Sequence, residues 1–154
     1  MTSPFASATR ATRRLATSIA FAATAAVGAA CGGDDGFSPD DEDVIGQYET
    51  TQFMLFRQAD TLDLLAEGSF VTLALDANRT TSGQFFVFQG NDDGTDFQED
   101  LTGTWQLTGT KVLLDQTADT FLRDYPLHVR EAGVLELRET DNAGVTLVIR
   151  LERQ

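Results

Sequence analysis

The chain has 154 residues, of which 11 are basic and 24 acidic, giving a formal net charge of −13 and a sequence pI near 4.2. A surface this negative repels phosphate backbones and anionic lipid headgroups, which argues against nucleic-acid binding. With one cysteine and one histidine, the chain has no internal disulfide and lacks the ligands of the usual tetrahedral zinc site. No cofactor is predicted.

Residues 1–30 have the pattern of an export signal. Three arginines and no acid stand before an Ala-rich apolar run over residues 15–30. An uncleaved membrane anchor is one alternative, although the run is short for a transmembrane span. An ordinary secretory signal is another. A twin-arginine signal at Arg13-Arg14 is disfavoured, because Ala16 and Thr17 stand where that motif has bulky apolar residues.

The end of this run, Val27-Gly28-Ala29-Ala30-Cys31, resembles the lipobox of bacterial lipoprotein signal peptides. The resemblance implies cleavage between Ala30 and Cys31, with a diacylglyceryl group on the Cys31 thiol. Two or more acyl chains give stable membrane anchoring. The protein is therefore expected to be exported and lipid-anchored to a bacterial membrane, outside the cytoplasm. Gly32, in place of a retention-type Asp, favours the periplasmic or outer-membrane face in a diderm.

Residues 31–43 are predicted to be a disordered tether. They are acidic and Gly/Asp-rich, with little to bury. Calcium binding by these acids is an alternative, but nothing in the segment fixes their geometry. After cleavage, eight basic and 24 acidic residues remain, a net charge of −16. The folded part is then residues 44–154, a single domain.

The dominant pattern in this domain is alternation of apolar and polar residues with period two, interrupted by turn residues roughly every 8–12 positions. The predicted strands are 46–57, 69–76, 82–89, 100–108, 111–116, 127–131, 134–140 and 145–152. Residues 61–67, between the first two strands, form the helix candidate, with Gly68 as its stop signal. A loop is the alternative there.

Short hairpin links and one-sided strands predict an all-β fold, an antiparallel up-and-down meander barrel of about eight strands. A two-sheet sandwich is the alternative. The element order resembles lipocalin-like small lipoproteins, and Gly46-Gln47-Tyr48 looks like their G-x-W motif with Tyr in place of Trp. The resemblance implies that an arginine of the last strand, Arg150 or Arg153, packs over the Tyr48 ring.

An eight-stranded barrel is either filled by its side chains or holds one small ligand. The inward residues that would line such a site are Leu73, Leu75, Trp105, Leu107, Leu135, Leu137, Leu147 and Ile149. We therefore expect an envelope lipoprotein that binds a small apolar molecule in its barrel, or a partner protein at the rim. The alternative is a structural or interaction module with a filled core and no ligand.

No catalytic set is predicted. His128 alternates with Leu127 and Val129, which places it on the outer face, and no nucleophile accompanies it. The acidic loop 91–96 is a weak calcium candidate, but its flanks are strand-like and Gln89 falls at the first ligand position of an EF-hand. A hairpin turn is favoured and no metal site is predicted.

Aromatic residues mark two further positions. Phe85-Phe86-Val87-Phe88 carries aromatics on both faces of its strand, so one face enters the core. The other face packs beneath a loop or helix, or forms an exposed interaction stripe. Trp105 is expected in the core, although an inward Trp also suits an apolar ligand.

Overall fold

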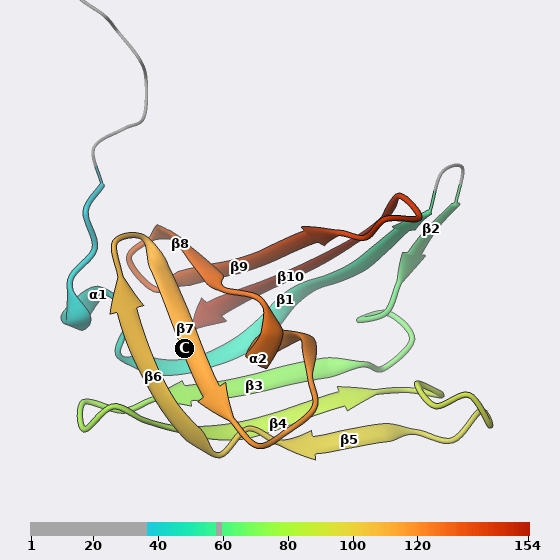
Figure 1. Ribbon diagram of the computed structural model, residues 1–154, viewed down its shortest axis with the longest axis horizontal. Helices are drawn as coiled ribbons and strands as arrows, with labels where there is room; N and C mark the ends of the chain where they lie inside the picture. The colour runs from blue at the N-terminus through green and yellow to red at the C-terminus, as the bar shows by residue number, and fades with distance from the viewer. Residues whose placement is uncertain (1–36, 58–59) are drawn as a thin grey trace, which may run out of the picture. The chain divides into compact units, whose positions relative to one another are not determined.

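The computed structural model describes residues 37–57 and 60–154 (Figure 1). The predicted signal peptide, its cleavage position and Cys31 lie outside these residues. All of these described residues belong to one compact unit. Its elements are α1 (Asp41–Val44), β1 (Gly46–Arg57), β2 (Asp60–Asp63), β3 (Phe70–Leu75), β4 (Thr80–Val87), β5 (Phe97–Asp100), β6 (Gly103–Thr108), β7 (Lys111–Gln116), α2 (Phe121–Asp124), β8 (Leu127–Glu131), β9 (Val134–Thr140) and β10 (Val145–Arg153).

Eight antiparallel strands form a closed barrel in the order β1-β3-β4-β6-β7-β8-β9-β10, and β10 pairs back onto β1 to complete it. This confirms the predicted all-β meander barrel. The short strands β2 and β5 pair with the ends of β1 and β4 and lengthen one side of the barrel (Figure 1). Closure gives each of the eight main strands two neighbours, although β7 and β8 pair only at Lys111 and Val112.

Strand β1 changes its inward face halfway along. A register shift against β10 lies between Thr50 and Gln52. Before it, Tyr48 is buried; after it, Phe53 is buried and Leu55 is half-buried against the core. One extra residue reverses the alternation of a strand, so this bulge turns odd-numbered side chains inward for the rest of β1.

Residues 61–67, the helix candidate, instead form most of β2 and a turn over 64–68. A helix of this length is marginal because nucleation costs more than a few hydrogen bonds return. As a strand, the segment pairs with β1, with Leu62 opposite Leu55. The helices in the described residues are the single turns α1 and α2.

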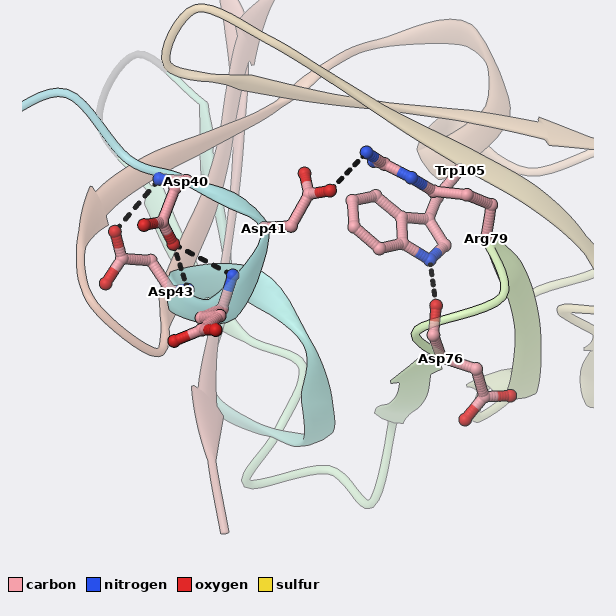
Figure 2. Close-up of polar contacts among 7 residues, drawn as sticks. Asp40, Asp41, Asp43, Asp76, Arg79 and Trp105 are labelled. Atoms are coloured by element: carbon pink, nitrogen blue, oxygen red, sulfur yellow. Dashed lines mark hydrogen bonds and ion pairs between the residues drawn. The ribbon is translucent and has the colours of Figure 1, made fainter.

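Helix α1 closes one end of the barrel. Asp40 caps it, accepting hydrogen bonds from the backbone N–H groups of Glu42 and Asp43 (Figure 2). Val44 is fully buried, and the Tyr48 hydroxyl donates a 2.7 Å hydrogen bond to its carbonyl. Helix α1 thus occupies residues 41–43 of the segment predicted as tether.

A second set of contacts holds α1 to the barrel. The Arg79 guanidinium forms an ion pair with Asp41 and lies 4.2 Å from the centre of the Trp105 ring. The Trp105 indole N–H donates a 2.9 Å hydrogen bond to the Asp76 carbonyl (Figure 2). These contacts join the β3–β4 turn and β6 to α1 and complete the closed end.

Candidate functional site

The end of the barrel opposite α1 contains a cavity of about 870 Å³. Its walls come from the second half of β1, β2 and the following turn, the end of β4, α2, the end of β9 and the start of β10. The lining residues are Phe53, Leu55, Arg57, Leu62, Leu64, Glu67, Val87, Phe88, Gln89, Gly90, Phe121, Tyr125, Glu139, Asp141, Val145 and Leu147. The volume falls within the range of about 300–1,000 Å³ typical of ligand pockets.

The barrel below this cavity is filled. Phe53 forms part of the cavity wall and its ring lies 5.9 Å from that of Phe85. Leu137 and Ile149 occupy the same row of the sheet as Phe53 and are fully buried. The inward side chains therefore meet in the closed half and leave space in the other.

Of the eight residues predicted to line a ligand site, one lines the cavity and seven do not. All have their side chains in the core or packed against it. Leu147 lines the cavity. The remaining seven, in the filled half or near the closed end, do not: Leu73, Leu75, Trp105, Leu107, Leu135, Leu137 and Ile149. Trp105 instead borders a separate hollow of about 660 Å³ beside Arg79.

Aromatic side chains surround the mouth of the cavity. Phe121 and Tyr125, at the two ends of α2, are 51% and 38% exposed, and Phe88 is 44% exposed. Phe85 points into the core, while Phe86 stacks on Phe70 with ring centres 5.2 Å apart. The aromatic residues of β4 thus pack on both faces, and Phe88, just after the strand, lines the cavity.

Charged side chains lie among these apolar walls. Glu139, opposite Leu147 in the β9–β10 ladder, continues the inward face of Leu135 and Leu137 and is half-buried. Asp141 follows at the β9–β10 turn, where its carboxylate accepts hydrogen bonds from the backbone N–H groups of Ala143 and Val145.

Arg57 is the basic residue of the lining, at the end of β1. It is paired with Val145 on one side and with Asp60 of β2 on the other. Directly opposite residues in a ladder share a face of the sheet. Asp60 therefore lies beside Arg57 on the same face of the β1–β2 pair.

Sequence reasoning missed Glu139 and Arg57. For Glu139 the signal was present, because period-two alternation from Leu135 and Leu137 puts a carboxylate next on an apolar face. Alternation alone does not predict that Arg57 lies at the cavity, because the bulge after Thr50 reverses which residues of β1 face inward.

The other candidate residues of the sequence, His128 and the acidic loop 91–96, do not line the cavity. His128 is on the outer face, as predicted, opposite Lys111 and Glu136. Partial burial, together with the charges of Arg130 and Lys111, lowers its pKa.

In the acidic loop, the Asp93 carboxylate accepts hydrogen bonds from the backbone and hydroxyl of Thr95, which lowers the pKa of Asp93. The Asp96 carboxylate accepts one from the Gln89 backbone. Across residues 37–57 and 60–154, no three His, Cys, Asp or Glu side chains are grouped to hold a metal ion. Nor does a helix in these ranges have the length and apolar character to cross a membrane.

The predicted lipocalin-type motif has an arginine beside it. The stem of Arg153 lies against Gly46, where any side chain would collide with it, and its guanidinium donates to the carbonyls of Glu42 and Ile45, at 3.1 Å each. Burial raises the pKa of Tyr48 to about 12, and the charge of Arg153 opposes that rise. Arg150 instead pairs with Glu131 and Glu152. Arg153 thus links β10 to α1.

Comparison with protein-family models, curated proteins and solved structures gave no significant match for this chain.

Proposed function

We propose that the protein is a membrane-anchored envelope lipoprotein whose barrel binds a small apolar molecule in the cavity at its open end, without catalysing a reaction. The observation that carries the proposal is the combination of a filled, capped half and an open half with a cavity of about 870 Å³. Ligand sites are typically concave, mostly apolar and supplied with a few polar groups.

The walls of this cavity have that character. Leu55, Leu62 and Leu147 supply aliphatic surface from three strands, and Phe121 and Tyr125 add exposed aromatic surface at the mouth. Transfer of an apolar molecule from water to such walls is favourable by about 25 cal/mol for each Å² removed from water. Anchoring is the separate part of the proposal, and it rests on the lipobox resemblance at Cys31.

The second candidate is a structural or interaction module without a ligand. The packing that favours it is the filled half of the barrel, where Leu73, Leu75 and Leu135 are at most 1% exposed. In that case the aromatic mouth would serve as a contact surface for an envelope protein.

A titration with Nile red, a neutral apolar dye, separates the two candidates. Residues 32–154 include the whole compact unit and can be studied without the anchor. The ligand-binding proposal predicts saturable binding of one dye. Val145 lines the cavity, so Val145→Trp should fill the space and weaken binding at least tenfold. Its neighbour Thr146 lies on the outer side of the same strand, opposite Thr140, and Thr146→Trp is the matched control.

Saturable binding lost in Val145→Trp and kept in Thr146→Trp would support the ligand site. Absence of saturable binding, or equal binding by both variants, would contradict it. Should Val145→Trp fail to unfold cooperatively, Leu62→Trp on the short strand β2 tests the same space with less effect on the barrel.

A further inference from the structure

We infer that the occupant of the cavity is an amphiphile with an apolar tail and a cationic head, an alkyl amine in the simplest form. This inference rests on the proposed function, because it concerns the chemistry of the same cavity. The charges of the lining carry it. Among the lining residues, the acids Glu67, Glu139 and Asp141 face one basic residue, Arg57.

The placement of these charges matches such a molecule. In the sheet, Glu139, Leu147 and Leu55 form one row across β9, β10 and β1, and Val145 and Arg57 form the next row toward the mouth. Below lies the apolar floor with Phe53. A tail on that floor would leave its head between the row of Glu139 and the next row, which Asp141 joins by donating its backbone N–H to the Val145 carbonyl.

Glu139 is available to such a head. It is half-buried on the inward face of β9, and no hydrogen bond or ion pair engages its carboxylate within the described residues. Its outward neighbour on the same strand, Glu136, is by contrast held by Arg130 at 2.6 Å. A carboxylate without a cation, at the edge of an apolar cavity, is stabilised by an ammonium group.

The positive charge of Arg57 does not reverse the preference for a cationic head. Its ladder partner on β2 is Asp60, whose carboxylate opposes the arginine's field. The four segments that contribute lining residues outside β1, residues 60–69, 88–96, 117–126 and 139–145, together carry ten acidic residues and one arginine. The field at the open end is therefore strongly negative, which attracts cations and repels fatty-acid carboxylates.

Three ligands of equal chain length test the inference: decylamine, decanol and decanoate, each competing with Nile red on residues 32–154 at neutral pH. We expect decylamine to bind about tenfold more tightly than decanoate, with decanol between them; tenfold corresponds to about 1.4 kcal/mol. Raising the salt concentration should narrow the gap, because these charges lie near the solvent.

The double variant Glu139→Gln/Asp141→Asn should bind decylamine only about threefold more tightly than decanoate, or less. Asn at position 141 keeps an acceptor for the turn. Glu49→Gln is the control, since Glu49 is an exposed acid on the capped half of β1, and it should leave the preference unchanged.

The outcomes are distinguishable. Failure of all three ligands and of Nile red to bind would overturn the proposed function. Binding of decanoate as tight as that of decylamine would overturn the cationic-head inference alone and leave the apolar site standing. A preference that survives the Glu139→Gln and Asp141→Asn pair would show that the net charge of the protein, and not this site, selects the head.

Discussion

The division of the barrel into a filled and an open half predicts that the same leucine truncation has different costs in the two halves. Leu137 is fully buried in the filled half, whereas Leu147 lines the cavity and is 7% exposed. Truncation of a packed leucine to alanine costs about 2.7–5 kcal/mol, through the lost transfer energy and the new void. We expect about 3–4 kcal/mol for Leu137→Ala.

Leu147→Ala should cost about 1–2 kcal/mol, because one side of the Leu147 side chain already faces open space and loses few contacts there. The assay is urea unfolding of residues 32–154, followed by the fluorescence of Trp105, the single tryptophan, which is 3% exposed. The urea dependence of the unfolding free energy should stay unchanged, so the midpoints report stability. Equal losses in the two variants would refute the division into filled and open halves.

Three further predictions concern other parts of the chain. Tyr48→Phe should lower the unfolding free energy by about 1–3 kcal/mol, because it leaves the buried Val44 carbonyl without its donor; Tyr125→Phe, at an exposed site, is the control, and an equal effect of both would contradict the role of Tyr48. NMR titration should place the folded pKa of His128 below the usual value of about 6.5. As the pH falls, the unfolded chain protonates His128 before the folded protein does, so the unfolding free energy decreases between about pH 6.5 and the folded pKa. His128→Gln should remove that part of the pH dependence. A folded pKa of His128 at or above about 6.5 would contradict this prediction. Cys31→Ser should abolish incorporation of labelled fatty acid in a bacterial host, whereas unchanged labelling would rule out the lipobox interpretation.

The barrel itself could be predicted from the sequence because the responsible interactions are local. Turn residues mark the hairpins, and alternation such as Leu135, Leu137 or Leu147, Ile149 fixes the inward face of each strand. The predicted spans 46–57, 111–116, 127–131 and 134–140 coincide with β1, β7, β8 and β9.

The position of the cavity could not be predicted in the same way. Leu137 and Leu147 look alike in the pattern, and what separates them is how much volume the opposing strands supply at each level of the barrel. The bulge after Thr50 sets which β1 side chains face inward at each level, and α1 covers the end opposite the cavity. Both depend on contacts between distant residues, such as Arg153 with the carbonyls of Glu42 and Ile45.

Native mass spectrometry of residues 32–154 mixed with decanol tests the central claim most directly, because it counts bound molecules. The account predicts a single one-to-one adduct that is lost on unfolding, is strongly reduced in Val145→Trp and persists in Thr146→Trp. A statistical series of adducts, or a one-to-one adduct of equal abundance in Val145→Trp, would contradict a ligand site in the open half of the barrel.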